Sequence, residues 1–403
     1  MERRIGVCFI GALGSISVTT IVGALAIRKS LEDCTGMATA AEPFDQLDLI
    51  SVDNLQFFGF DIRKEKLGIA AEALTEHPCG LNPRLLASLR ADLKDIEPNI
   101  FPGFVMNCGD AITQLCSLPE DNNLSLREIT DQLQQQINDF KRIRRLDDVI
   151  VINLASTEPP LTIQECHTDV HSLEKAIDDN LVSAFRASSL YTYSAIKTNC
   201  PYINFTPSNG ALFPALVELA RTHHVPVMGD DGKTGETLVK SALAPMFKAR
   251  NLQVMSWEGF NILGNMDGRV LNHTDNRQSK INTKDAILPK ILGYAPHSGV
   301  HINYVPSLAD QKTAWDFIHF KGFLGSMMSM QFIWQGFDSM LAAPLVLDLI
   351  RLAEFAHRKG ESGLMPHLAS YFKAPLEEDE HGFSAQMNML HDYAFKHANK
   401  QDS

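Results

Sequence analysis

The fold is decided by residues 5–29, IGVCFIGALGSISVTTIVGALAIRK. The apolar run Ile5–Ile10 predicts a short buried strand, and the segment from about Val18 to Lys29 predicts a helix. Glycines between them predict a tight turn, so the stretch matches the opening unit of a dinucleotide-binding fold. Leu13 stands where a further glycine is usual, which makes the motif a loose one.

The glycine turn is the first candidate cofactor site. Gly11 and Gly14 allow a pyrophosphate to approach the backbone where the helix begins, next to Ser15. Basic residues before the apolar run imitate a signal peptide, but glycines and serines interrupt that run, and the next one ends at Arg28 and Lys29. No run reaches the roughly 20 apolar residues that span a bilayer. We expect a soluble, cytoplasmic protein.

Apolar runs alternate with helix-like segments up to about residue 240, which predicts an α/β fold with a doubly wound parallel sheet. Ligands bind such sheets at the carboxyl ends of the strands. Asp61 ends one apolar stretch, and we expect it to reach a ribose hydroxyl, with an insertion between it and the glycine turn. Ser156 and Thr157 follow the buried strand in DDVIVINLAS, residues 147–156.

Two turns rich in Gly, Asp and Asn follow, GDDGKTG at 229–235 and NILGNMDG at 261–268, and then SKINTK at 279–284. Such turns let backbone N–H groups approach an anion, and Lys280 and Lys284 can present two ammonium groups on one helix face. The succession suits a phosphorylated, hydroxyl-rich small molecule. Each motif alone is more often an ordinary turn or solvated surface.

Composition sets the limits. A chain of 403 residues predicts two domains or one large domain with an insertion, and a net charge of −12 argues against nucleic acid or an anionic membrane as partner. Seven scattered cysteines without CxxC spacing indicate a reducing compartment. Cys166, His167 and His171 would need to share a helix to hold a metal; the ordinary interpretation is a polar helix start, and we expect no metal site.

Beyond Lys240 the pattern changes to strand-like pieces separated by polar connections, which predicts a second, mainly antiparallel sheet covered by another subunit. The apolar segment Ser339–His357 predicts a core helix that returns to the first domain. The tail after Glu377 is polar, and we expect a surface helix without a chemical role.

Several motifs in this order resemble those of the myo-inositol-1-phosphate synthases, also called inositol-3-phosphate synthases. The resemblance covers nearly the whole chain and is strongest in GDDGKTGET (229–237), NILGNMDG (261–268), SKINTK (279–284), ADQKTAWD (309–316), DSMLAAPLVLDL (338–349) and FKAP (372–375). It implies a Rossmann-like NAD domain at 1–240, an inserted α+β catalytic and oligomerisation domain at 241–337, and a return at 338–403, assembled as a homotetramer.

The resemblance further implies conversion of D-glucose 6-phosphate to 1D-myo-inositol 3-phosphate, a step of inositol and phospholipid biosynthesis. Oxidation at C5 acidifies the C6 protons, enolisation and aldol closure onto C1 form the ring, and hydride returns to C5, so NAD is used without net consumption. Negative charge develops on oxygen in these steps, and lysine ammonium groups can stabilise it or move protons.

Motif positions match four active-site lysines of the family. The resemblance assigns Lys373 to the C5 hydroxyl proton, Lys280 and Lys312 to the developing oxyanions, and Lys284 to the phosphate or C1 side, and Asn261 is a further expected substrate contact.

The same resemblance assigns Asp231 to the nicotinamide end and to orienting Lys373, and Thr234 occupies a position that is usually serine. The remaining residues expected to bind the cofactor or orient lysines are Asn265, Asp267, Asp310 and Asp338.

Three departures from the family pattern leave alternatives open. Leu13 replaces a glycine, Met266 stands where asparagine is common, and ASTE at 155–158 only approximates the usual strand end. With no long N-terminal extension, the chain resembles a compact, divergent, bacterial member. The alternatives are a cyclase or oxidoreductase for another phosphorylated sugar, a catalytically inactive homologue, and a dehydrogenase that releases NADH.

Overall fold

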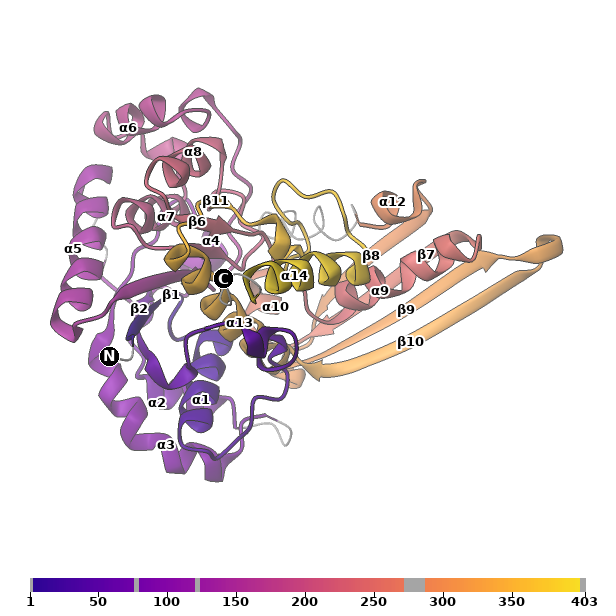
Figure 1. Cartoon of the computed structure of the whole chain (residues 1–403), viewed down its shortest axis with the longest axis horizontal. Coiled ribbons are helices and arrows are strands. Elements are labelled where there is room, and N and C mark those ends of the chain that lie inside the picture. The colour runs from indigo at the N-terminus through magenta and orange to yellow at the C-terminus, as the bar shows by residue number, and fades with distance from the viewer. Residues whose placement is uncertain (1–2, 76–79, 120–123, 272–286, 399–403) are drawn as a thin grey trace.

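The computed structural model describes residues 3–75, 80–119, 124–271 and 287–398, whose strands form two sheets. In Figure 1 the larger sheet and its helices form one body, from which the strands of the smaller sheet project. The α/β class and the two-sheet organisation expected from the sequence are therefore confirmed.

The larger sheet has seven parallel strands in the order β11-β6-β5-β4-β1-β2-β3. Strand β1 lies inside the sheet, where Val7 pairs with Phe57 of β2 on one side and with Ile150 of β4 on the other. Both faces of these strands are buried, which explains their continuous apolar runs. The bounds are β1 Ile5–Ile10, β2 Leu55–Asp61, β3 Ile100–Pro102, β4 Asp148–Asn153, β5 Tyr202–Asn204, β6 Pro226–Met228 and β11 Gly363–Leu364.

Helices cover both faces of this sheet, so it is doubly wound. One face packs against α1 (Ser15–Arg28), α2 (Leu67–Ala73), α3 (Pro83–Ile96), α13 (Asp338–Arg358) and α14 (Phe383–Ala398). The other packs against α5 (Leu126–Arg144), α6 (Val170–Asp178), α7 (Ala187–Lys197) and α8 (Pro214–Thr222). The short α4 (Asp110–Thr113) lies apart from both cores. Within the described ranges, no helix is both long and apolar enough to cross a bilayer.

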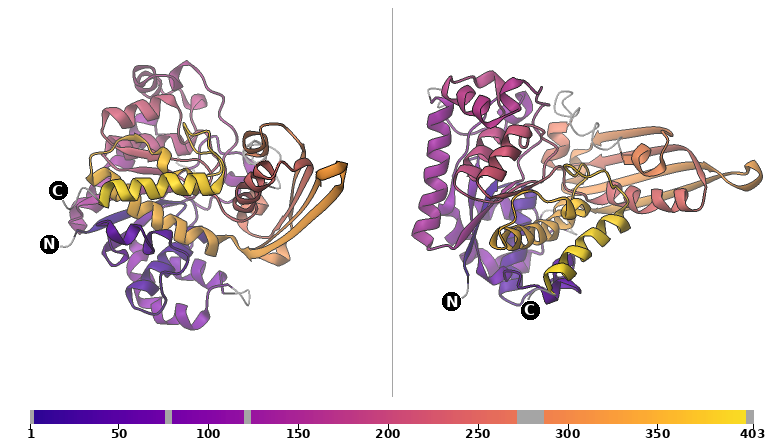
Figure 2. Two further views of the ribbon diagram at one scale, coloured as in Figure 1. Left: turned by 45° about the vertical axis from the view of Figure 1, so that its right-hand side comes forward. Right: turned by 45° about the horizontal axis from the view of Figure 1, so that its top comes forward.

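The smaller sheet has the order β10-β9-β7-β8. Its strands are β7 (Gln253–Leu263), β8 (His297–Tyr304), β9 (Gln311–Lys321) and β10 (Met327–Phe337). Helices α9 (Gly235–Ala249) and α12 (Ile287–Leu292) pack on one face around Trp257, and Figure 2 shows none of the described elements over the opposite face. The helix α10 (Met266–Leu271) follows β7 directly.

The smaller sheet is mainly antiparallel, as predicted, because β9 runs antiparallel to both β7 and β10, while β7 and β8 run parallel. The structure corrects three details of the sequence-based expectations. Strand β9, inside the smaller sheet, was not predicted. The helix expected from Asn180 begins only at Ala187, since Asn180 adopts a positive φ of 55° that ends α6. The tail helix α14 is not a mere surface helix, because it buries residues such as Gln386 and Leu390.

Candidate active site

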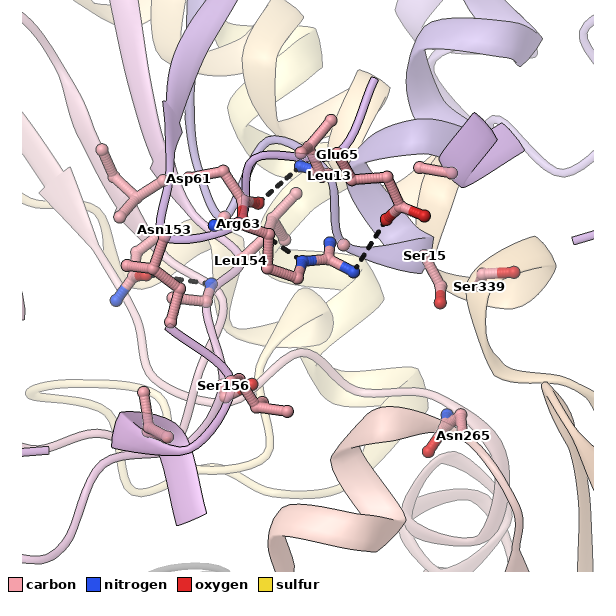
Figure 3. A pocket seen from close by; sticks show the side chains of 18 of the residues that line it. Leu13, Ser15, Asp61, Arg63, Glu65, Asn153, Leu154, Ser156, Asn265 and Ser339 are labelled. Carbon is pink, nitrogen blue, oxygen red and sulfur yellow. Dashed lines mark hydrogen bonds and ion pairs between the residues drawn. The ribbon is translucent and has the colours of Figure 1, made fainter. Parts of the chain in front are cut away.

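A cavity of about 340 Å³ opens at the carboxyl ends of β1, β2 and β4, within the size range of small-molecule sites. Figure 3 shows the hydroxyl groups of Ser15, Ser156 and Ser339 and the amide of Asn265 around it. The sequence-predicted residues in its lining are Gly11, Gly14, Ser15, Asp61, Ser156, Asn265 and Asp310. The parallel topology brings together the residues from Gly11 to Ser156, as expected for a doubly wound sheet. Asn265, after β7, and Asp310, before β9, are added by the smaller sheet.

The glycine turn after β1 is shaped for a ligand phosphate. Gly11 has a φ of +84°, and a Cβ there would lie 3.0 Å from the Cα atom of Ala155, so the turn requires glycine. Gly14 is the N-cap of α1 and offers no side-chain cap, which leaves N–H groups of the first turn for a ligand. An uncapped helix start at the rim of a cavity fits the pyrophosphate of a dinucleotide.

Asp61 has a structural task at this turn besides its expected contact with a ribose. Its Oδ2 accepts a hydrogen bond from Leu13 N at 2.7 Å, and its Oδ1 accepts bonds from the backbone N–H and the Nε of Arg63 (Figure 3). The carboxylate therefore holds the turn through Leu13, the residue that replaces a glycine. Asp61 lines the cavity, so its contact with a ribose stays a prediction.

A second cavity of about 140 Å³ continues past Gly14, Ser15 and Ser156 toward the 229–235 turn. The further predicted residues in its lining are Thr157, Asp231, Thr234, Asp338 and Lys373. The two cavities share part of their walls, so a ligand held at the glycine turn can extend toward Lys373.

Lys373 and Asp231 form a buried ion pair in this second cavity. The Nζ atom of Lys373 donates to Oδ1 of Asp231 at 2.7 Å, and both side chains are about 5% exposed. The backbones also pair, because Lys373 N donates to Asp231 O at 2.7 Å. Asp231 has a φ of +62°, an uncommon conformation outside glycine that often marks functional sites. The predicted orientation of Lys373 by Asp231 agrees with this geometry.

Lys312 lies near the start of α13. Its Nζ atom is 3.6 Å from Oδ1 of Asp338, and the same oxygen accepts a hydrogen bond from the Thr234 hydroxyl at 3.2 Å. Asp338 thus links the 229–235 turn to β9, which carries Lys312. Lys312 itself is buried and is not among the described residues that line either cavity.

Asp310 joins the two cavities and is a weak acid in this setting. Burial, with the Asp338 carboxylate as a further cause, raises the pKa of Asp310 to about 6, although hydrogen bonds from Ser339 oppose the shift. The Ser339 hydroxyl donates to its Oδ2 at 2.5 Å. A carboxyl group that is easily protonated beside a ligand cavity can donate or accept a hydrogen bond.

Not every predicted residue can be placed at the cavities. Asn261 is fully buried, and its amide Nδ2 donates to Oε2 of Glu236 at 2.5 Å, outside the described linings of both cavities. Lys280, Lys284 and the side chain of Asp267 lie outside the described residues. Their roles stay predictions.

The structure adds charged residues that sequence reasoning missed. Lys233 is fully buried close to Lys373, and its Nζ atom donates to Oε1 of Gln386 on α14. Asp230 is also buried, and desolvation raises its pKa to about 8. Both residues lie inside the GDDGKTG motif, so the sequence could have indicated them as candidates. The sequence around Gln386 contains no motif that indicates its contact with Lys233.

His167 has a structural role. Its Nδ1 accepts a hydrogen bond from Gln164 N at 2.9 Å, and its Nε2 bonds to the carbonyl oxygen of Ala184 at 2.8 Å. Because both ring nitrogens are engaged by the backbone, this histidine is better explained by packing than by ligation.

Comparison with known proteins gives one consistent result. Residues 5–394 match a family of NAD-binding proteins described as myo-inositol-1-phosphate synthase. The chain is 33% identical over 401 residues to inositol-3-phosphate synthase 1 from Bacteroides thetaiotaomicron, covering 94% of this chain and 91% of that protein.

Two crystal structures are also similar along most of the chain. Inositol-3-phosphate synthase from Caenorhabditis elegans has a TM-score of 0.87 at 25% identity, with 99% of this chain and 86% of the other covered. A myo-inositol-1-phosphate synthase-related protein from Thermotoga maritima has a TM-score of 0.80 at 25% identity, covering 97% and 98%.

Proposed function

We infer the activity of this chain from its family: the chain belongs to the myo-inositol-1-phosphate synthase family. It is an NAD-dependent isomerase that converts D-glucose 6-phosphate to 1D-myo-inositol 3-phosphate. One structural observation supports this most strongly. The Lys373–Asp231 pair lines a cavity that shares its walls with the glycine turn, so an amine and a dinucleotide site meet where a sugar can lie between them.

Bound NAD would supply the reversible hydride acceptor that the reaction at C5 of the sugar requires. The glycine turn and the start of α1 are proposed to hold its pyrophosphate, with Ser15, Ser156 and Thr157 beside it. Asn265 and Asp310, which line both cavities, and Asp338, which lines the second, are proposed to hold the rest of the dinucleotide or to orient lysines. Thr234 assists through its hydrogen bond to Asp338.

We propose that Lys373 takes the proton of the C5 hydroxyl. Its amine lines the cavity, and Asp231 holds it in place at 2.7 Å. Lys312 and Lys280 stabilise the oxyanions that develop during enolisation and ring closure, and Lys284 contacts the phosphate or the C1 side. Lys312 is supported by its place beside Asp338, whereas Lys280 and Lys284 rest on motif position alone.

Incubation with glucose 6-phosphate and a small amount of NAD tests the activity. We expect inositol phosphate to exceed the NAD supplied by many turnovers, with no accumulation of NADH, because the hydride returns to the sugar. Phosphate analysis after periodate treatment and absorbance at the NADH band measure the two quantities. Accumulated NADH would instead indicate a net dehydrogenase. Product formed from another sugar phosphate but not from glucose 6-phosphate would show that the substrate is that other sugar phosphate.

We propose that residues 241–337 form an oligomerisation domain, which is inserted in the chain between residues 1–240 and residues 338–403. We further propose that this domain assembles the chain into a homotetramer. The edge strand β10 has eleven residues and no charge, and edges of this kind pair with other chains unless they are protected. Trp315 on β9 and Ile333 on β10 lie opposite each other and are 38% and 68% exposed. The ring of Phe260 stacks on the ring of Trp315, with 5.1 Å between the ring centroids. Another subunit would cover this apolar face.

Ile333→Lys should weaken this assembly, because a lysine must be desolvated at the interface. Light scattering should give about four times 44.7 kDa for the parent chain and a smaller mass for the variant. Ile143→Lys is the matched control, since Ile143 on α5 is 67% exposed and Ile333 is 68% exposed. Equal masses for both variants would contradict the proposed interface.

We propose a cytoplasmic location because the described cysteines form no disulfides. Six cysteines of the described chain are free thiols, several of them buried, as is common in reducing compartments.

A further inference from the structure

Lys233 is a charged side chain with an unusual setting. It is 2% exposed, and its Nζ atom donates to Oε1 of Gln386 and, at 3.4 Å, to the carbonyl oxygen of Ala369. The amide of Gln386 is itself fixed, because its Nε2 donates to the Glu380 carbonyl at 2.6 Å. Both of these acceptors are neutral, so the ammonium of Lys233 is buried without a hydrogen bond to a carboxylate of the described chain.

A short antiparallel pairing places Lys233 close to Lys373. Lys233 N donates to Tyr371 O at 2.7 Å, and Lys373 N donates to Asp231 O at 2.7 Å, with Gly232 and Phe372 between them. A Cβ on Gly232 would lie 2.1 Å from the Phe205 ring, so this turn is tightly confined. One continuous backbone pairing therefore holds Lys233 and Lys373 close together.

The charges around Lys233 come from three segments. The turn itself supplies Asp230 and Asp231, the facing segment supplies Lys373, and the loop before α14 supplies Glu380 and His381. Burial first and the like charge of Lys373 second lower the pKa of Lys233 to about 7, against a smaller opposing effect of Glu380. The interaction is mutual, so an ammonium at Lys233 favours the neutral amine at Lys373.

We propose that Lys233 is a positioning residue that acts through Lys373: its buried positive charge, held by Gln386 of α14, keeps the Lys373 amine available to take the proton of the sugar hydroxyl. This proposal rests on the proposed role of Lys373. It also gives the C-terminal helix a part in the site, since α14 supplies the acceptor that holds Lys233 in place.

The experiment compares the pH dependence of kcat, at saturating glucose 6-phosphate and NAD, for the parent chain and Lys233→Met. Methionine keeps the length of the side chain and removes its charge. Because Lys373 is then easier to protonate, the acidic limb of the profile should move to higher pH by about one pH unit, so the rate at low pH falls roughly tenfold while the rate at high pH is largely kept. An unmoved acidic limb would overturn the proposal.

A second variant separates charge from packing. In Lys233→Met/Gln386→Met both partners of the hydrogen bond become apolar, so much of any lost thermal stability should return. The shifted acidic limb should persist, because the charge is still absent. If the limb returns to its original position together with the melting temperature, Lys233 is only structural. Lys233→Arg, which retains a positive charge, should keep the limb at or below its original pH.

A readout without turnover keeps this test independent of the proposed reaction. Acetic anhydride reacts with neutral amines, and peptide mass spectrometry gives the fraction of Lys373 modified at each pH. Lys373 in Lys233→Met should need a higher pH for half-modification than in the parent chain. If the parent chain makes no inositol phosphate, the proposed function fails, yet this labelling shift still decides whether Lys233 acts on Lys373.

Discussion

Lys373→Ala should lower kcat by roughly three orders of magnitude or more, because the variant loses the group proposed to take the C5 proton. Among the described residues that line the second cavity, Lys373 is the one lysine, and Asp231 holds its amine in place. Turnover is measured as inositol phosphate formed per active site. The control is Lys248→Ala, which removes an exposed lysine on α9 and should leave kcat unchanged.

Folding must be separated from chemistry in this variant. Removing the ammonium takes away a buried partner of the Asp231 carboxylate, a change that costs about 3–5 kcal/mol when a buried pair is broken. The double variant Asp231→Asn/Lys373→Met avoids a stranded charge and should fold more stably than Lys373→Ala while remaining inactive. A folded Lys373→Ala protein with kcat within tenfold of the parent chain would refute the proposed role.

The parallel, doubly wound sheet and the place of the cavity could be predicted from the sequence because both follow from short local patterns. The strand Ile5–Ile10, the glycine turn and the later buried strands each carry their own signal, and parallel pairing forces their carboxyl ends to one edge. That rule alone gathered Gly11, Ser156 and Asp231 around connected cavities.

The remaining features depend on contacts between distant segments, which no local pattern contains. Strand β9 was missed because Gln311–Lys321 alternates polar and apolar residues only weakly, and its pairing with β7 and β10 is what makes it a strand. The role of Gln386 depends on a bond that joins residues 153 positions apart. For Asp61, the sequence predicted a place at the cofactor site but not the hydrogen bond that its carboxylate accepts from Leu13 N.

Gly14→Asp should lower the affinity for NAD by about 100-fold or more while leaving the fold intact. Gly14 is the N-cap of α1, with φ −65° and ψ 153°, a conformation that aspartate adopts readily. Aspartate is a favoured N-cap residue, so the helix itself should gain about 0.5–1 kcal/mol. The same carboxylate occupies the N–H groups proposed for the pyrophosphate and repels its charge.

The two effects therefore have opposite signs, and this makes the variant informative. NAD binding is measured by calorimetry on the parent chain and the variant, and thermal unfolding without NAD gives the stability. Gly14→Ser is the matched control, because serine caps the helix without a charge and should lose much less affinity than aspartate does. A Cβ at this position lies 3.1 Å from Gly11 O, so both variants share the same small steric cost. Because that cost cancels in the comparison, a large difference between them isolates the charge. Equal affinities for aspartate and serine would place the pyrophosphate away from the start of α1, and the glycine turn would then have only a structural role.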